Sequence, residues 1–298
     1  MIDITSNKNI KPNPIDVSLS IVNWNTRDLT SALIDSIYNT VKKLSVEILV
    51  VDNASTDGSV EHIVRYYPKV IVIKNVNNVG YGRAHNQALR ISKGRYKMIL
   101  NSDVLLLDNA LENMVAFLDE NKDAGAVGPI CLNRDGSVGY SYGNFPRPGS
   151  LILERWLGSL AQEFIKAPPL EGKPEENMDG KMEVDYIKGA CMLVRKEVCD
   201  EVGLFDEDFF AYFEESDWCF RMQKRGFKRY LTSNAKIVHI ADASFGKVPE
   251  KARRYFENGI KTYLEKHYGK ILTSIFVGAN AWGNFRHKMK KTLLRLVD

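Results

Sequence analysis

The sequence lacks the features of a membrane-spanning or disulfide-rich protein. No apolar run reaches the roughly 18 residues that a membrane-spanning helix needs. Residues 1–16 are polar and contain no apolar signal core. The four cysteines show no CxxC spacing and no histidine at the distance of a zinc site. We therefore expect reduced cysteines and a cytoplasmic protein.

Several nucleotide-binding signatures are also missing. No GxxxxGK[ST] motif occurs, which excludes a P-loop, and Gly80 and Gly82 lack the spacing of a dinucleotide fingerprint. The formal net charge is only +4 over 298 residues, which does not indicate nucleic-acid binding. With 44% hydrophobic and 26% charged residues, the composition is that of a globular protein. The length suits one large domain, with or without an appendage.

Short apolar runs alternate with helical patterns in the first part of the chain. Strands are predicted at 17–22, 46–51, 70–73 and 97–100, and apolar residues at helical spacing lie between them. This alternation predicts an α/β fold with a mostly parallel central sheet flanked by helices. Each strand is followed by polar residues, which parallel strands would bring to one edge, where such sheets bind ligands.

The fourth of these polar ends is Asn101, Ser102 and Asp103. A carboxylate at the sheet edge can hold a divalent cation, and the cation can hold phosphates. Asn, Ser and Asp also favour turns through local hydrogen bonds, so a simple turn is the alternative.

The second half of the chain is predicted to extend the sheet and to end in helices. Asp135-Gly136 marks a hairpin, 151–165 reads as a helix and 167–180 as a loop. The acidic and aromatic stretch 205–217 leads into a helix from Glu214 to Lys224. Further strands are predicted at 125–128, 184–187, 189–194 and 236–239, and helices at 249–267 and beyond 271.

Several motifs occur in a characteristic order, and together they carry a family resemblance. The sequence resembles the family 2 glycosyltransferases with the GT-A fold, in particular the bacterial rhamnosyltransferase-like branch, over about residues 17–268. The matching pieces are Val22-Asn-Trp-Asn25, Val51-Asp-Asn-Ala-Ser-Thr-Asp-Gly-Ser59, Asn77-Asn-Val-Gly-Tyr-Gly-Arg-Ala-His-Asn86, Leu100-Asn-Ser-Asp103, Gly189-Ala190, residues 205–221, His239 and Ser244.

The resemblance implies a nucleotide-diphosphate sugar, a divalent metal and an acceptor hydroxyl. Glu215 would be the general base, and Asp103, with His239 as a further ligand or phosphate contact, would bind Mg²⁺ or Mn²⁺. Trp24 and Asp52 would contact the nucleobase. The complete set of donor-binding residues would be Val22, Trp24, Asn25, Asp52, Asn77, Gly80, Tyr81, Asn86, Asn101 and Ser102.

Two departures from the family pattern affect these roles. Asn101-Ser102-Asp103 replaces the Asn-Pro-Asp of many relatives, so only one carboxylate is assigned to the metal. Glu214-Glu215 replaces a Glu-Asp pair, which leaves Glu214 and Asp217 as secondary candidates for the base, with Gly189 as a further secondary site residue.

Each assignment has a structural alternative. Trp24 could belong to the core, and Asp57 is predicted to cap a helix. Glu214 and Asp217 fit the acidic first turn that the helix dipole favours. A single histidine after a strand, such as His239, is more often structural than a ligand.

The resulting hypothesis is an inverting, metal-dependent transferase that moves a sugar, with rhamnose as one candidate. The donor would be dTDP-, UDP- or GDP-linked, and the acceptor a bacterial cell-surface glycan or a lipid-linked glycan. The alternatives are a nucleotide-sugar-binding protein without turnover and a nucleotidyltransferase on a similar fold. The latter needs a basic, glycine-rich loop after the first strand, which 23–26 does not provide.

The expected organisation is a polar segment (1–16), a GT-A domain (17–268, with halves at 17–128 and 129–268) and a basic amphipathic tail (269–298). Basic and apolar residues on opposing faces of the tail suit the inner surface of the cytoplasmic membrane. Packing on the domain or on a partner subunit is the alternative. The basic residues are Arg286, His287, Lys288, Lys290, Lys291 and Arg295.

Overall fold

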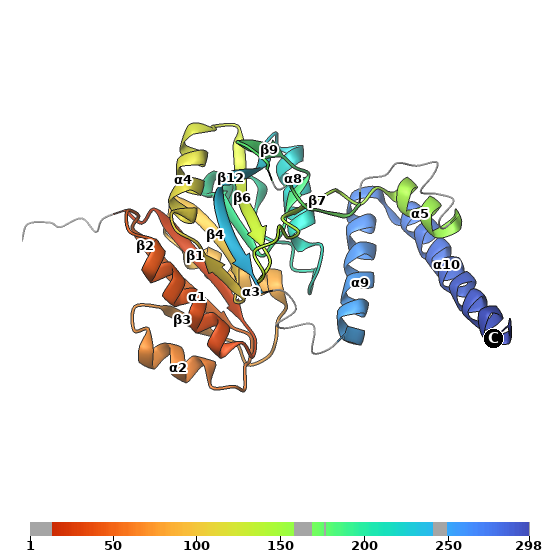
Figure 1. Cartoon of the computed structure of the whole chain (residues 1–298), viewed down its shortest axis with the longest axis horizontal. Coiled ribbons are helices and arrows are strands. Elements are labelled where there is room, and N and C mark those ends of the chain that lie inside the picture. The colour runs from red at the N-terminus through yellow and green to blue at the C-terminus, as the bar shows by residue number, and fades with distance from the viewer. Residues whose placement is uncertain (1–13, 158–168, 176, 241–248, 298) are drawn as a thin grey trace, which may run out of the picture.

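The computed structural model describes residues 14–157, 169–175, 177–240 and 249–297. A nine-stranded sheet flanked by helices forms the main body, and three helices form an extension on one side (Figure 1). Along the main path of the sheet the strand order is β3-β2-β1-β4-β11-β6-β12-β5. The strands are β1 (Val17–Asn23), β2 (Val46–Asp52), β3 (Ile71–Lys74), β4 (Tyr96–Asn101), β5 (Val104–Leu106), β6 (Ala124–Leu132), β11 (Cys191–Arg195) and β12 (Lys228–His239), with β9 (Lys181–Glu183) paired to β12.

The four N-terminal strands β3, β2, β1 and β4 are mutually parallel, as the alternation of strands and helices predicts. Their carboxyl ends therefore lie at one edge, where Asn23 pairs in register with Asp52. The connecting helices are α1 (Arg27–Thr40), α2 (Ser59–Tyr66) and α3 (Tyr81–Ile91).

The other half of the sheet is mixed. β11 is antiparallel to both β4 and β6, whereas β12 is parallel to β6 and antiparallel to β5. The prediction of a last strand limited to 236–239 was wrong, because β12 begins at Lys228. In its first half the consecutive residues 229–232 are all buried, so polar and apolar side chains do not alternate. Arg229 is tolerated there because its buried guanidinium donates to the carbonyls of Asp185 and Phe227.

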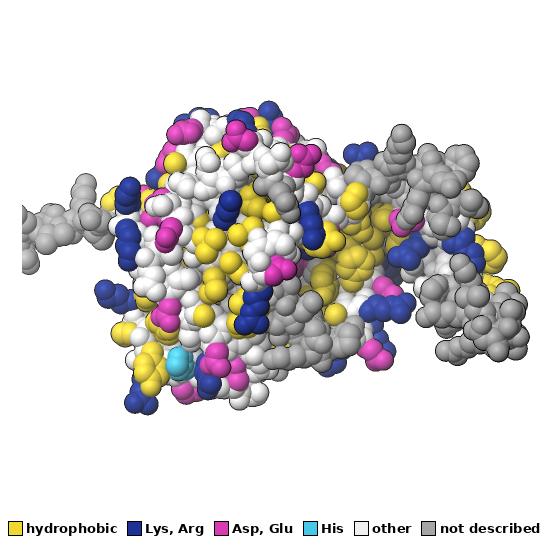
Figure 2. All heavy atoms as spheres, in the orientation of Figure 1, with side chains coloured by type: hydrophobic (Ala, Val, Ile, Leu, Met, Phe, Trp, Pro, Cys, Tyr) yellow, Lys and Arg dark blue, Asp and Glu magenta, His cyan; other side chains and the backbone are white. Residues whose placement is uncertain are grey.

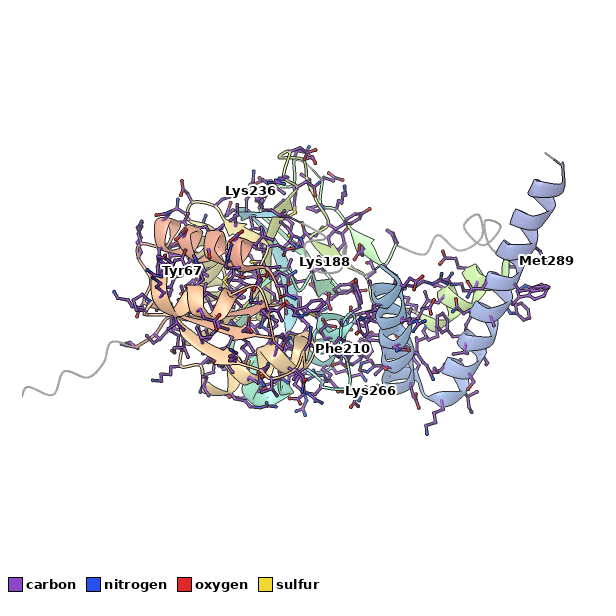
Figure 3. All side chains as sticks on the ribbon, turned by 90° about the horizontal axis from the view of Figure 1, so that it is seen from below. Tyr67, Lys188, Phe210, Lys236, Lys266 and Met289 are labelled. Carbon is purple, nitrogen blue, oxygen red and sulfur yellow. The ribbon has the colours of Figure 1, made fainter. Side chains whose placement is uncertain are left out.

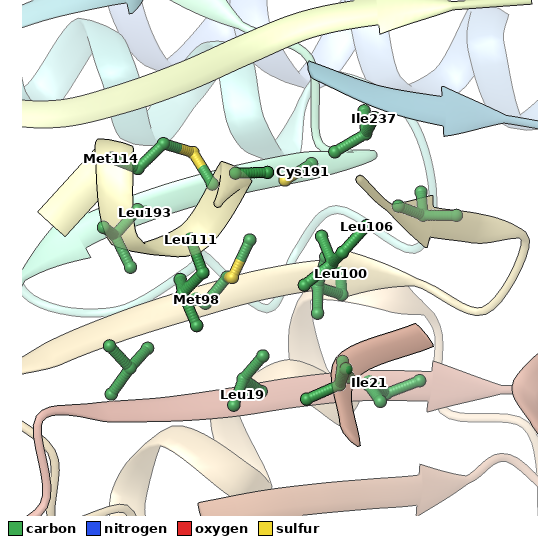
Figure 4. Close-up of a cluster of buried hydrophobic side chains, with 14 of the residues drawn as sticks. Leu19, Ile21, Met98, Leu100, Leu106, Leu111, Met114, Cys191, Leu193 and Ile237 are labelled. Carbon is green, nitrogen blue, oxygen red and sulfur yellow. The ribbon is translucent and has the colours of Figure 1, made fainter. Parts of the chain in front are cut away.

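Alternation within the buried strands supplies apolar side chains to both faces of the sheet. Met98 and Leu100 pack with α1 and with α4 (Ala110–Glu120) on one face (Figure 4). Ile99 points to the other face, where Trp218 and Met222 of α8 (Glu214–Lys224) belong to the same cluster. Each fully buried large side chain contributes about 1.5–3 kcal/mol. The sheet edge that carries the polar loops is thus held by a core on both sides.

A small second sheet lies beside the main one. It consists of β10 (Tyr186–Ile187), β7 (Tyr142–Gly143) and β8 (Glu171–Gly172). The described part of the predicted loop 167–180 therefore contains a strand. The turn predicted at Asp135-Gly136 is present, with Gly136 at φ +82°.

The extension consists of α5 (Pro148–Leu157), α9 (Pro249–Tyr268) and α10 (Lys270–Val297). The helix predicted at 151–165 corresponds to α5 as far as residue 157, and its remainder lies outside the described residues, as do Ser244 and residues 1–13. The extension is joined to the body by a cluster in which Phe209 and Phe213 pack with Tyr263 and Phe276. Figure 3 shows the labelled Phe210 and Lys266 at this junction and Met289 far along α10. Within the described ranges, no helix combines the length and apolar character required to cross a bilayer.

Candidate active site

Asp52 joins the loops that follow β1 and β2. Its Oδ1 accepts from Asn23 Nδ2 at 2.7 Å, and its Oδ2 accepts from the Ser55 amide at 3.0 Å. The side chain is fully buried. Because both carboxylate oxygens are bonded within the protein, Asp52 fixes the shape of the sheet edge, and its contact with a nucleobase stays a prediction.

The loop after β1 is held against the loop after β2. Asn25 has φ +54°, a conformation that asparagine tolerates. Its amide donates to Ser55 Oγ at 2.9 Å, and its side-chain oxygen accepts from the Thr56 amide at 2.8 Å. Trp24 is half-buried within this loop, and Val22 packs beneath it against the core. The aromatic ring is thus retained at the edge of the sheet with part of its surface open.

The beginning of α3 is pressed against the acidic and aromatic stretch. Gly80 has φ +90°, and a Cβ added there would lie 2.5 Å from the Phe210 carbonyl oxygen. The Tyr81 amide donates to that same carbonyl at 2.9 Å. Asn53 of the second loop donates to the Gly80 carbonyl at 3.2 Å, while Asn77, just before, is exposed. Only glycine allows this close approach of two distant segments.

Asn86 does not have the free amide expected of a donor-binding residue. It is buried, and its Nδ2 donates both to the Phe205 carbonyl at 2.9 Å and to Glu207 at 3.0 Å. Its Oδ1 accepts from the Phe205 amide at 3.0 Å. Asn86 therefore has a positioning role, because its hydrogen-bonding groups fix the start of the 205–213 segment, and its contact with the donor stays a prediction.

Tyr81 lies at the centre of the predicted site. Its hydroxyl donates to the Gly189 carbonyl at 2.6 Å, and a Cβ added to Gly189 would lie 3.7 Å from the carboxyl carbon of Glu215. Burial, followed by the negative charges of Glu214, Glu215 and Asp103, raises the pKa of Tyr81 well above its ordinary value. The charges of Asp103, in the turn after β4, and of Glu215, at the start of α8, thus both act on the Tyr81 hydroxyl.

Asp103 lies in the tight turn between β4 and β5, and this turn is at the sheet edge that carries the polar loops. Its Oδ1 is 3.3 Å from His239 Nε2, and its carbonyl accepts from the Ile240 amide at 2.8 Å. Asn101 Nδ2 lies 3.5 Å from the same histidine nitrogen, and Ser102 Oγ is 2.8 Å from Thr26 Oγ1. The end of β12 therefore brings His239 next to Asp103, as the resemblance implies.

The side chains that could bind a metal at this point are one carboxylate, Asp103, and one imidazole, His239. In the part of the chain that the structure describes, no group of three or more His, Cys, Asp or Glu residues could hold a metal ion. Mg²⁺ is usually bound by one or two carboxylates together with substrate phosphates. Asp103 and His239 therefore fit a metal whose coordination is completed by the diphosphate of a donor, and they do not form a full cage by themselves.

Glu214 and Glu215 begin α8 after two strained residues. Tyr212 and Phe213 have φ of +69° and +71°, which bulky residues rarely adopt and which often marks a functional site. Glu214 is 5% exposed and Glu215 is half-buried, and the Oε2 atom of each is buried without a hydrogen-bond partner among the described residues. Burial raises the pKa of both carboxyls. A carboxyl with a raised pKa and one such oxygen is suited to accept a proton.

The third acidic residue of this helix, Asp217, has a structural role. Its Oδ2 accepts from Arg221 Nε at 2.8 Å, and its Oδ1 lies 2.8 Å from His267 Nε2 of α9. The side chain is almost completely buried. Both oxygens are thus engaged, Oδ2 within α8 and Oδ1 with α9 of the extension, which distinguishes Asp217 from the two glutamates.

Sequence reasoning missed Lys188 and Glu171. The charge of Lys188 lowers the pKa of Glu215 and opposes the effect of burial. Lys188 forms an ion pair with Glu171 of β8, on the segment predicted to be a loop. A lysine directly before Gly189-Ala190 was the only available signal, because the small second sheet that unites these residues is not evident from the sequence.

Comparisons with known proteins agree with this geometry. The family model described as Glycosyl transferase family 2 matches residues 18–203, more than half of the chain. The N-acetylglucosaminyl-diphospho-decaprenol L-rhamnosyltransferase of Mycobacterium tuberculosis is 29% identical over 68% of this chain and 69% of its own length. The UDP-Glc:alpha-D-GlcNAc-diphosphoundecaprenol beta-1,3-glucosyltransferase WfaP of Escherichia coli is 24% identical over 89% of this chain and 93% of its own length.

Among solved structures, the chain is similar to the crystal structure of GalNAc-T7 with UDP, GalNAc and Mn²⁺. The TM-score is 0.59 at 16% identity, and the match covers 85% of this chain and 48% of the other, so the chain spans about half of that structure. At this identity the likeness shows the fold alone, which is the GT-A fold. The chain belongs to glycosyl transferase family 2.

Proposed function

We propose that this glycosyltransferase is an inverting, metal-dependent enzyme that moves a sugar from a nucleotide-diphosphate donor to a hydroxyl of a lipid-linked glycan. The observation that carries the proposal is that Gly189 lies beside both the Tyr81 hydroxyl and the Glu215 carboxyl, while the charge of Asp103 also acts on Tyr81. Asp103 would serve the leaving diphosphate and Glu215 the incoming hydroxyl.

The chemistry requires one base and one site for the leaving group. The acceptor oxygen attacks the anomeric carbon, the bond from that carbon to the diphosphate oxygen breaks, and its electron pair leaves with the nucleoside diphosphate. Glu215 takes the proton of the acceptor hydroxyl, a role for which its unpartnered Oε2 is suited. One displacement with a single base on the acceptor side inverts the configuration.

The leaving diphosphate develops negative charge. Asp103 and His239 would hold Mg²⁺ or Mn²⁺, which, when bound, stabilises that charge on the phosphate oxygens. Because the protein would supply two ligands to the metal, we expect the metal and the nucleotide sugar to bind together.

The names of the relatives support the choice of substrates. One relative transfers L-rhamnose and the other glucose from UDP-Glc, and both names specify an acceptor with N-acetylglucosamine on a diphospho-polyprenol. We extend this acceptor class to the present chain. Rhamnose remains the first donor sugar to test, with the dTDP-, UDP- and GDP-linked forms compared.

A lipid-linked acceptor makes contact with a membrane surface useful. In α10 the exposed residues Ile271, Ile275, Trp282, Phe285 and Met289 recur at helical spacing. The helix sequence contains six Lys and Arg residues and no acidic residue between 270 and 297. An exposed apolar stripe on a basic helix suits the interface of an anionic membrane. We propose that this helix brings the enzyme to the inner face of the cytoplasmic membrane.

The test is nucleotide release from a panel of nucleotide sugars, with a synthetic N-acetylglucosamine diphospholipid and Mg²⁺, Mn²⁺ or chelator. We expect metal-dependent release that needs the acceptor. Glu215→Gln should keep donor binding by calorimetry and lose about 10²-fold or more in kcat, the range of general-base catalysis. Asp103→Asn should instead weaken donor binding in the presence of metal. Donor binding without release from any sugar of the panel would favour the binding-protein alternative.

The membrane contact has its own measurement. Co-sedimentation with vesicles containing phosphatidylglycerol should fall when Trp282 and Phe285 are both replaced by Ser. Leu105→Ser, which removes a half-buried apolar residue of β5 in the body, is a control for nonspecific loss of apolar surface. Equal sedimentation of the Trp282/Phe285 variant and the unmodified protein would contradict the proposal.

A further inference from the structure

A cavity lies outside the site described above, between the three helices of the extension. It has a volume of about 280 Å³ and is lined from α5, α9 and α10. Its apolar wall consists of Phe256, Ile260 and Phe276, of which the last two are buried in the cluster that joins the extension to the body. Its polar groups are contributed by Arg155, Arg253, Glu257, Asn280 and Asn284.

The polar lining is incompletely satisfied. Arg253 Nε pairs with Glu257 at 2.9 Å within α9. Among the described residues, no hydrogen bond or ion pair engages the guanidinium of Arg155 or the side-chain amides of Asn280 and Asn284. Free donors thus line the cavity from two helices, α5 and α10. Aromatic and aliphatic groups line it from α9 and α10.

This combination matches an anionic amphiphile. An arginine guanidinium recognises phosphate by paired hydrogen bonds, and asparagine amides add donors. The apolar wall would take the hydrocarbon that follows the phosphate. The volume is near the lower limit of about 300 Å³ for ligand pockets, so it suits a phosphate group and the first part of a chain, with the remainder leaving the cavity.

The cavity is adjacent to the catalytic segment. The Phe256 ring lies 5.0 Å from that of Phe213 and 5.8 Å from that of Tyr212, directly before Glu214. A Cβ on Gly259 would lie 2.6 Å from the Tyr212 carbonyl oxygen, so α9 is pressed onto this strained turn. On the face seen in Figure 2, hydrophobic side chains gather where the body meets the extension. A ligand in the cavity would therefore lie one side chain away from the segment that presents the base.

We infer that the cavity between α5, α9 and α10 binds the isoprenyl-diphosphate portion of the acceptor, with Arg155 on the phosphates and Phe256, Ile260 and Phe276 on the first isoprene units. The inference rests on the proposed function, because it assigns a place to the lipid end of the acceptor whose sugar would reach Glu215. It explains why the extension, with its exposed apolar helix, is joined to the turn before α8.

The direct test is calorimetric binding of farnesyl diphosphate to the full chain in EDTA, which prevents metal-assisted binding at Asp103. We expect Arg155→Gln and Asn280→Ala each to weaken binding, the first by about tenfold or more, as for loss of a hydrogen bond to a charged group. Arg254→Gln, on α9 but not among the lining residues, is the matched control and should change binding less than about twofold.

Binding measurements with other ligands test which part of farnesyl diphosphate is recognised. Inorganic pyrophosphate should bind more weakly than farnesyl diphosphate, because it lacks the apolar part. Vesicles of phosphatidylcholine with phosphatidylglycerol should not displace farnesyl diphosphate. Circular dichroism melting of Arg155→Gln and Asn280→Ala verifies that the extension is folded, and the two variants make different changes to the same cavity.

Several results would overturn the inference. These are no binding, an equal loss for Arg155→Gln and Arg254→Gln, equal affinity for pyrophosphate, or displacement by the vesicles. Failure of the proposed function is separable, because the nucleotide-release panel tests it. An active transferase without Arg155-dependent binding refutes this inference alone, whereas an inactive chain with such binding refutes the proposed transfer alone.

Discussion

Lys188 offers a sharp test of the assignment of Glu215 as the base. Burial raises the pKa of the Glu215 carboxyl, and the positive charge of Lys188 is the largest effect that opposes this rise. Replacing Lys188 by Met keeps an unbranched side chain and removes the charge. A base acts in its ionised form, so a higher pKa moves the acidic limb of the pH profile of kcat/KM to higher pH.

The magnitude follows from the surroundings of the pair. A positive charge close to a carboxylate lowers its pKa by about 1–3 units. Lys188 is also paired with Glu171, whose negative charge offsets part of this effect, so the lower end is appropriate. We expect the limb to move up by about one unit, or about 1.4 kcal/mol. Below both pKa values kcat/KM should fall about tenfold, and above both it should be nearly unchanged.

The assay is nucleotide release over a pH series at low acceptor concentration. Lys224→Met is the matched control. Lys224 is on α8, the helix of Glu215, but its ammonium lies over the Phe220 ring, 4.6 Å from the ring centroid. Its acidic limb should coincide with that of the unmodified protein. An unshifted limb in Lys188→Met, or the same shift in both variants, would refute the reasoning that Glu215 is the base.

Three further predictions concern stability. Burial raises the pKa of Glu214, so ionising this carboxyl costs free energy in the folded state. Glu214→Gln should therefore stabilise the protein by about 1 kcal/mol or more near pH 8 and by almost nothing near pH 4. Thermal melting at both pH values measures this difference. Gly259→Ala should destabilise the protein, because a Cβ would lie 2.6 Å from the Tyr212 carbonyl oxygen. Gly278→Ala, in open space on α10, should instead stabilise the protein by up to about 1 kcal/mol. Similar urea denaturation midpoints for the two variants would contradict this packing of α9. Asp217→Asn should lower the free energy of unfolding by about 1–3 kcal/mol, since it weakens the buried contacts of this carboxylate with Arg221 and His267. An unchanged denaturation midpoint would argue against the bridge between α8 and α9.

The strand and helix pattern was predictable where local sequence and final environment agree. The run Met98 to Leu100 is apolar on both sides because the sheet is covered on both faces, so the strand is evident in the sequence. The first half of β12 was not predictable for the opposite reason. Arg229 is a poor strand signal, and it is buried only because the carbonyls of Asp185 and Phe227 accept its hydrogen bonds.

The site residues divide in the same way. The order of the motifs identified Asp103, His239 and Glu215, and the structure brings these residues to the surroundings of Tyr81 and β12. Asn86 belongs to the same motif set, yet its amide is used to hold the 205–213 segment. A motif records which residues occur together, and it does not record which partner each side chain finds.

The sequence by itself determined the alternation of strands and helices, the family and the edge of the sheet at which polar residues gather, because these follow from local periodicity and short motifs. Only the tertiary structure distinguished Glu215, whose Oε2 has no hydrogen-bond partner among the described residues, from the bridging Asp217, two residues away on the same helix. It alone also formed the cavity between α5, α9 and α10. Both results depend on helices distant in the chain, since His267 lies 50 residues beyond Asp217, and no local pattern encodes such contacts.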